Sequence, residues 1–172
     1  MTRYQLAKIV DWAGTLRTRK RMQKVVYLLQ VKGCPLESEY RLHYYGPYSH
    51  DVARLTDEMV RGGMLDEKSE EDAAGERFSY RLSERARQQV AAHEAKPDGS
   101  LEAKQIGKFE DLARELLVVD LKELEVASTI VFFRKHGSEW HDAVDKTCQF
   151  KGLPPDTPFL KRTQELARRI ID

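Results

Sequence analysis

Apolar residues recur every three or four positions in two early stretches of the chain, which is the spacing of amphipathic helices. The two stripes consist of Leu6, Ile9, Val10 and Ala13, followed by Met22, Val25, Val26 and Leu29. Gly14 is expected to close the first helix, and Gly33 with Pro35 the second, because glycine and proline commonly follow helix ends. Residues 16–21 would then link the two helices.

A third helix is predicted to follow Ser49. This serine stands where an N-cap belongs, and Asp51 would lie in the first turn, at the positive end of the helix dipole. Gly62-Gly63 would end the helix. Its apolar stripe consists of Val52, Leu55 and Met59.

Strands are predicted on both sides of this helix. Residues 40–45 are rich in aromatic residues that favour strands, and Gly46-Pro47 would end that strand in a rigid turn. Met64-Leu65 would begin another strand, whose partner is residues 77–82 with their period-two alternation. Residues 66–76 are predicted to be a flexible acidic loop. The order helix, helix, strand, helix, strand indicates a winged helix-turn-helix.

The rest of the chain is predicted to be helical. Ser83 would cap a further helix, and Ala95 to Ser100 (AKPDGS) has the composition of a linker. Later apolar stripes occur at residues 109–116, 121–134, 140–147 and 160–170. The second of these is apolar nearly all round from Val126 to Phe133 and is expected to be the most buried. The predicted fold is mainly α with a small β-wing, a winged-helix-like module at 1–95 and a helical region at 101–172 packed on it.

Composition indicates a globular protein. Charged residues make up 33% of the chain and hydrophobic residues 41%, and the longest strongly apolar run, residues 130–133, is too short to span a bilayer. The charged first twenty residues predict no signal peptide. Cys34 and Cys148 are isolated, which favours free thiols in a reducing cytosol over a disulfide or metal site. A cytoplasmic location is therefore expected, with no membrane partner.

Charge is distributed unevenly along the chain. Through residue 35, one acid, Asp11, stands against the basic residues Arg3, Lys8, Arg17, Arg19, Lys20, Arg21, Lys24 and Lys32. Such a basic segment can contact phosphate or an acidic protein, or it can complement acidic parts of the same chain.

The sequence contains no convincing catalytic, cofactor or metal motif. Ser49-His50-Asp51 has the residues of a catalytic triad, but neighbours at a helix start point about 100° apart and cannot form the relay. His136, His141 and Cys148 lack the spacing of zinc ligands. Carboxylates such as Glu70 lie in the predicted mobile loop, where nothing would raise their pKa. A non-enzymatic protein without a cofactor is expected.

Binding to a protein or to nucleic acid remains open from the residues. A winged helix usually reads DNA with its third helix, which here offers His50 and Arg54 together with several acids, and the predicted wing is acidic. Three tyrosines around residue 46 could pack locally or dock a partner. The expected binding surface consists of Lys20, Arg21, Lys24, Tyr44, Tyr48, His50 and Arg54. Gln23 and Tyr27 are expected to make buried hydrogen bonds to the turn.

Two segments resemble a known family. Residues 20–29 (KRMQKVVYLL) and 43–49 (HYYGPYS), with a later Tyr80 to Glu84 element, resemble the YwgA-like bacterial proteins. They are more distantly similar to the Panacea-domain (SocA-like, phage-associated) antitoxins. The YwgA resemblance implies no activity. The Panacea resemblance implies an antitoxin that neutralises toxins by protein contacts, although helices beyond residue 95 exceed the antitoxin pattern.

A cytoplasmic protein-interaction or regulatory module, related to toxin–antitoxin or phage-associated regulators, is thus the leading expectation. Its partner would be a toxin or an acidic protein. The alternative is a winged-helix DNA-binding transcriptional regulator. The sequence leaves open whether the chain forms a homodimer.

Overall fold

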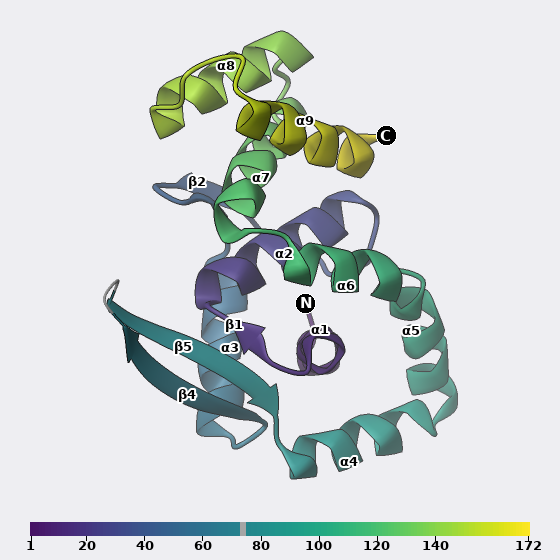
Figure 1. The fold of residues 1–172 in the computed structure, drawn as a ribbon. Helices are drawn as coiled ribbons and strands as arrows, with labels where there is room; N and C mark the ends of the chain where they lie inside the picture. The colour runs from purple at the N-terminus through teal and green to yellow at the C-terminus, as the bar shows by residue number, and fades with distance from the viewer. Residues whose placement is uncertain (73–74) are drawn as a thin grey trace.

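The N-terminal half of the computed structural model has the order expected of a winged helix (Figure 1). The structure describes residues 1–72 and 75–172. The elements up to residue 94 are α1 (Arg3–Ala13), β1 (Leu16–Arg17), α2 (Arg19–Val31), β2 (Arg41–His43), β3 (Gly46–Tyr48), α3 (His50–Arg61), β4 (Leu65–Asp72), β5 (Gly75–Leu82) and α4 (Glu84–Glu94). The predicted caps are confirmed: the Ser49 side chain accepts from the Val52 amide, and the Ser83 side chain from the Ala86 amide.

A three-stranded antiparallel sheet carries the wing. Its strand order is β1-β5-β4, so the short strand between the first two helices pairs with the returning strand of the hairpin. Leu16 lies opposite Tyr80, and Leu65 opposite Leu82, and all four side chains are buried. The predicted fold class, mainly α with a small β-wing, is confirmed.

The wing is longer than predicted. The flexible loop expected at 66–76 is wrong, because β4 extends to Asp72 and β5 begins at Gly75; residues 73–74 of that loop lie outside the described residues. Cross-strand pairing offers a physical reason. Asp66 lies opposite Arg81 and Glu70 opposite Arg77, so basic residues of β5 face acidic residues of β4.

Two further short strands differ from the prediction. Residues 16–21 are not a linker, since β1 occupies Leu16–Arg17 and α2 begins at Arg19. Gly46-Pro47 does not end the sheet structure either: it belongs to β3, which returns antiparallel to β2. Leu42 lies opposite Pro47, next to the pair His43 and Gly46 that closes the two-residue turn. At that position the missing N–H of the proline would face away from β2.

The C-terminal half is helical, as predicted. Its elements are α5 (Pro97–Gly107), α6 (Glu110–Val118), α7 (Leu121–Lys135), α8 (Trp140–Lys151) and α9 (Pro158–Ile171). The six-residue linker predicted at 95–100 is wrong, because Pro97 starts α5 and presets its first turn. Gly99 allows this sharp corner, since a Cβ there would come 1.9 Å from the His93 carbonyl oxygen.

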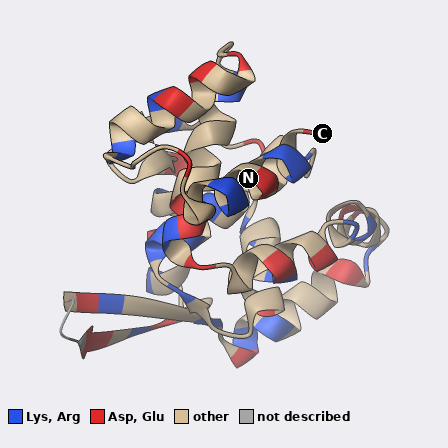
Figure 2. Ribbon diagram, turned by 45° about the horizontal axis from the view of Figure 1, so that its top comes forward, with Lys and Arg blue, Asp and Glu red and all other residues tan. Residues whose placement is uncertain are grey.

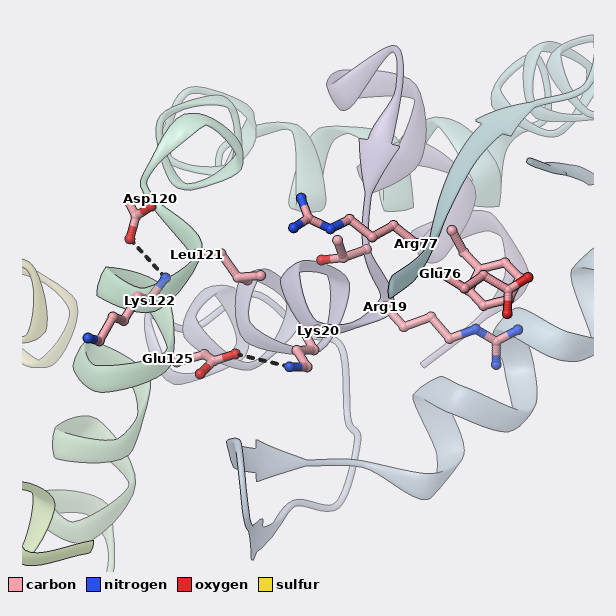
Figure 3. Close-up of a pocket in the computed structure, with 10 residues that line it drawn as sticks. Arg19, Lys20, Glu76, Arg77, Asp120, Leu121, Lys122 and Glu125 are labelled. Carbon is pink, nitrogen blue, oxygen red and sulfur yellow. Dashed lines mark hydrogen bonds and ion pairs between the residues drawn. The ribbon is translucent and has the colours of Figure 1, made fainter. Parts of the chain in front are cut away.

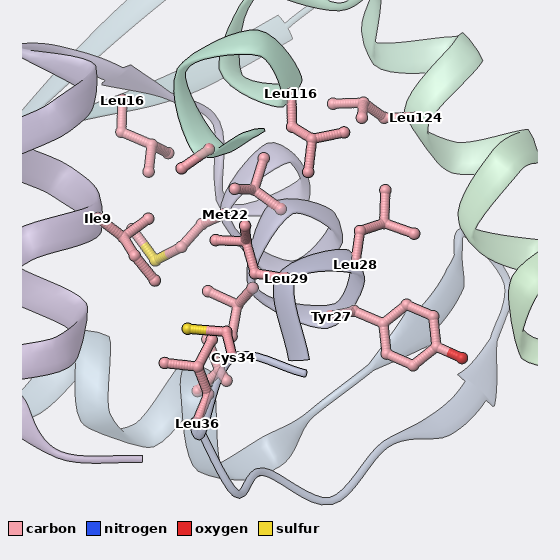
Figure 4. Packing of buried hydrophobic residues seen from close by; sticks show 14 of the residues in the cluster. Ile9, Leu16, Met22, Tyr27, Leu28, Leu29, Cys34, Leu36, Leu116 and Leu124 are labelled. Carbon is pink, nitrogen blue, oxygen red and sulfur yellow. The ribbon is translucent and has the colours of Figure 1, made fainter. Parts of the chain in front are cut away.

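One apolar core spans both halves of the chain (Figure 4). It joins Ile9 and Met22 of the first two helices to Leu116 of α6 and Leu124 of α7. Residues 126–132 of α7 are all buried, as the sequence predicts, and this helix packs against α2, α8 and α9. Division of the chain near residue 95 stays a prediction. In the part of the chain that the structure describes, each helix is too short or too polar to cross a membrane.

Candidate functional site

The segment between α2 and α3 is held down by polar side chains of α2. The Gln23 amide donates to the Ser49 carbonyl at 2.9 Å and accepts from the Ser49 N–H at 2.8 Å. Two turns further along, Gln30 pairs in the same way with both backbone groups of Ser38, at 2.9 and 2.7 Å. The hairpin β2–β3 is thus anchored at both ends.

The expected role of Gln23 is confirmed, whereas that of Tyr27 is wrong. Gln23 is buried and bonded to the residue that caps α3. The Tyr27 hydroxyl is also buried but has no hydrogen-bond partner among the described residues. Its ring packs against Tyr40 at 4.8 Å between centroids, so Tyr27 contributes by packing.

Lys24 lies beneath the hairpin and cannot belong to an exposed surface. Its side chain is 2% exposed, and its ammonium donates to the Pro47 carbonyl oxygen at 2.7 Å. Burial lowers the pKa of Lys24 to about 8, and the neighbouring Glu125 carboxylate opposes that shift. The expectation that Lys24 is exposed for binding is therefore wrong, because the hairpin folds back over α2.

Arg21 is also occupied within the molecule. Its guanidinium donates to the carbonyl oxygens of Leu117 at 3.0 Å and Val119 at 2.5 Å, where α6 ends. Burial lowers the pKa of Arg21. Free carbonyls at a helix C-terminus attract cations, so Arg21 joins α2 to the α6–α7 junction. Part of its side chain still reaches the surface.

Two tyrosines form the exposed tip of the hairpin. Tyr44 is 75% exposed and Tyr45 is 41% exposed, and their rings meet edge to face at 5.0 Å between centroids. Phe150, near the end of α8, is exposed beside them and lines the same hollow of about 200 Å³. Large exposed aromatic side chains that share one hollow are a feature of interaction sites.

Lysines surround these rings. Lys20 places its ammonium 3.3 Å from the centre of the Tyr45 ring, and Lys151 lies 5.3 Å from that of Phe150. Lys151 also donates to the Tyr44 carbonyl oxygen at 3.2 Å. Lys122 lines the hollow from α7. We call this surface the tyrosine–lysine face: Lys20, Tyr44, Tyr45, Lys122, Phe150 and Lys151.

Glu125 is the carboxylate that balances this group of cations. It lies 4.0 Å from the Lys20 ammonium, and its charge acts on both Lys24 and Lys151. Figure 3 shows the pair Lys20 and Glu125 beside a second hollow, of about 640 Å³, between β5 and the starts of α2 and α7. Three lysines near one carboxylate leave an excess of positive charge under the tyrosines.

The remaining predicted residues lie elsewhere, at the start of α3. Tyr48 packs between His43 and His50, with ring centroids at 5.5 and 5.1 Å. Arg54 pairs with Glu58 at 2.9 Å and with Asp51 at 3.6 Å. Tyr48, His50, Asp51 and Arg54 line a separate hollow of about 370 Å³, to which His43 and Glu58 do not contribute. As far as the structure describes the chain, its lining shares no residue with the hollow of the tyrosine–lysine face.

The structure therefore divides the predicted surface. Lys20 and Tyr44 belong to the tyrosine–lysine face, Tyr48, His50 and Arg54 to the α3 hollow, and Lys24 and Arg21 to internal contacts. Sequence reasoning missed Lys122, Phe150 and Lys151, which come from a region far along the chain. The neighbouring aromatic and basic residues at 150 and 151 are a weak signal that occurs on many helices.

The arrangement offers binding groups more than reactive ones. Burial raises the pKa of the Cys34 thiol to about 12, so it stays protonated at neutral pH. Within residues 1–72 and 75–172, side chains of His, Cys, Asp and Glu do not gather in threes as a metal site would need. Ser49 uses its hydroxyl to cap α3. The site can supply aromatic contact and positive charge.

The chain is distantly similar to a known bacterial protein. The chain is 30% identical over 80 residues to the uncharacterized protein YwgA of Bacillus subtilis (strain 168). The matched segment covers 46% of this chain and 48% of that protein, so the chain spans about half the length of the relative. No protein-family model matches the chain.

Proposed function

We propose that this chain is a non-catalytic protein-interaction module that docks an acidic segment of a partner protein on the tyrosine–lysine face. The observation that supports it most is the exposed Tyr44–Tyr45 tip, fixed above α2 and surrounded by lysines. Tyrosines provide large contact area at low cost in conformational entropy and are frequent hot spots of interfaces. The surrounding lysines favour a partner that carries carboxylates.

The contacts that hold the hairpin tip in place support binding of a partner without a large rearrangement of the hairpin. Gly46 follows the tip with φ of 93°, and a Cβ there would lie 2.7 Å from the Thr129 hydroxyl of α7. Gln23 and Lys24 bond the backbone directly after it. A binding loop held by such contacts loses little freedom on association, which leaves more of the contact energy for affinity.

The resemblance to antitoxins supports one class of partner. On the strength of the Panacea similarity of residues 20–29 and 43–49, we propose as partner a toxin or another protein of a phage-associated system, met in the cytoplasm. The chain would then act as a regulator by occupying that protein. No catalytic step is required.

Co-purification tests this proposal. Tagged wild type is compared with Tyr44→Ala/Lys122→Glu in nuclease-treated lysate of the source cells. Leu101→Ala/Lys104→Glu is the matched control, because both residues are exposed on α5. The expected result is a stoichiometric acidic protein that binds the control like wild type and the face variant about tenfold more weakly or worse. Equal retention by both variants would contradict the proposal.

A DNA-binding regulator is the second candidate, and the sheet topology favours it. The order β1-β5-β4 with α1, α2 and α3 is that of winged-helix DNA-binding modules. Charges oppose it: Arg54 is paired within α3, and the wing carries acidic as well as basic residues (Figure 2). DNA binding predicts that nucleic acid co-purifies before nuclease treatment, with affinity that falls by orders of magnitude between about 50 and 200 mM salt.

A further inference from the structure

A further charged hollow lies between α1, α2 and α6, with a lining of arginine and apolar side chains. It has a volume of about 610 Å³ and is lined by Trp12, Ala13, Thr15, Arg17, Arg21, Arg114, Leu117 and Val118. Within the described residues, this lining includes no carboxylate and shares no residue with the tyrosine–lysine face.

The three arginines differ in how much of their charge is free. Arg114 is held by Glu110 at 2.7 Å and by the Trp12 carbonyl oxygen at 2.9 Å. Arg21 uses Nη1 for the two carbonyl oxygens at the end of α6, and its other donors have no hydrogen-bond partner within residues 1–72 and 75–172. The Asp120 carboxylate acts on its charge from nearby. Arg17 is exposed, and its guanidinium forms no ion pair in the part of the chain that the structure describes. Two guanidinium groups therefore have donors left for an anion.

Apolar side chains form the other part of the lining. Val118 is 83% exposed at the end of α6, and Leu117 lies beside it, half-buried. An exposed valine next to two incompletely paired arginines suits a ligand that combines a carboxylate with an apolar side chain. A long nucleic acid fits less well than a short peptide, because it would extend past Arg17 into the neighbouring hollow, where Asp66 and Glu70 would repel its phosphates.

We infer that this arginine hollow binds an acidic peptide segment, with a carboxylate on Arg17 and Arg21 and a neighbouring apolar side chain on Leu117 and Val118. Arginine pairs with carboxylates through two parallel N–H···O bonds, which fixes the orientation of the segment. The site is independent of the proposed function, because its lining and its test do not involve the tyrosine–lysine face.

Titration of ¹⁵N-labelled protein with the acetylated, amidated peptide LELDL tests this inference by NMR. The arginine Nε–Hε signals of Arg17 and Arg21 should shift and saturate, whereas the amide peptide LQLNL should leave them in place. Arg17→Gln should weaken binding about tenfold or more. Arg85→Gln should leave it unchanged, because Arg85 is an exposed arginine on α4.

A milder variant guards against a folding artefact. Val118→Ser should weaken binding of LELDL about threefold or more, through loss of apolar contact alone. Equal binding by Arg17→Gln and wild type, or equal binding of LQLNL, would overturn the inference. Shifts produced by a single-stranded DNA dodecamer but not by LELDL would overturn it as well, in favour of a phosphate site.

Discussion

Residues of one type, close together in sequence, have different roles in this protein. Lys20 and Lys24 are one helical turn apart on α2. Lys20 covers the Tyr45 ring at the surface, whereas Lys24 is buried under Pro47. The difference arises because β3 of the hairpin covers Lys24 and shields it from solvent, whereas Lys20 lies beside the hairpin tip. Charge alone therefore does not identify a binding residue on this helix.

The buried ammonium of Lys24 predicts a pH-dependent stability. The pKa is lowered from 10.5 to about 8 in the folded protein. Between these two values the unfolded chain binds more protons than the folded one, so this group makes stability rise with pH across that window. Below about pH 8 both states are charged, and the contribution is constant. The full change amounts to about 3 kcal/mol.

Lys24→Met removes this titration. The free energy of unfolding of wild type, relative to Lys24→Met, should rise by about 3 kcal/mol between pH 8 and pH 10.5. Urea denaturation of both proteins across this range measures it, and tyrosine and cysteine ionisation cancel in the difference. A constant difference between the two proteins would show that Lys24 is not buried as described.

At the level of elements, the hairpin β2–β3 depends on one glycine. Gly46 has φ of 93°, and a Cβ would meet the Thr129 hydroxyl at 2.7 Å. Gly137 has a similar φ of 88° but nothing within 4 Å of a Cβ. The two positions share a positive φ, which strains any other residue, but only a side chain at position 46 would meet a neighbouring atom. A comparison of the two therefore separates the cost of backbone strain from the cost of overpacking.

Gly46→Ala should therefore destabilise the protein more than Gly137→Ala. Strain at a positive φ costs roughly 1–2 kcal/mol at both positions, and overpacking adds about 1–3 kcal/mol at residue 46 alone. Thermal and urea unfolding of the two variants give the comparison. Equal costs would mean that the hairpin does not rest on α7.

Most elements could be predicted because their signals are local. Capping serines, helix-ending glycines and apolar stripes located α1 to α4 and α6 to α9, whereas α5 was not predicted. The exceptions also have local causes. Gly46-Pro47 has the composition of a turn but forms β3, and AKPDGS has that of a linker although Pro97 starts α5. A two-residue strand such as β1 is too short to show periodicity.

At the level of the whole molecule, the tyrosine–lysine face is assembled from α2, the hairpin, α7 and α8. The sequence could point to Lys20 and Tyr44, because both lie in basic or aromatic segments. It could not bring Lys122, Phe150 and Lys151 to them, since no local pattern encodes contacts across about a hundred residues. The same folding buries Lys24 and ties one nitrogen of Arg21 to the end of α6, which leaves the other donors of Arg21 at the arginine hollow. Long-range packing thus decides which predicted residues remain available to a partner.

Photocrosslinking at the tip of the hairpin tests the proposed protein docking most directly. Benzoylphenylalanine replaces Tyr44 in living source cells, and Leu101 in the control. We predict a covalent adduct with an acidic protein from position 44, which disappears when Lys122→Glu is added, and none from position 101. An adduct from both positions, or from neither while the protein is folded and expressed, would contradict a docking role for the tyrosine–lysine face.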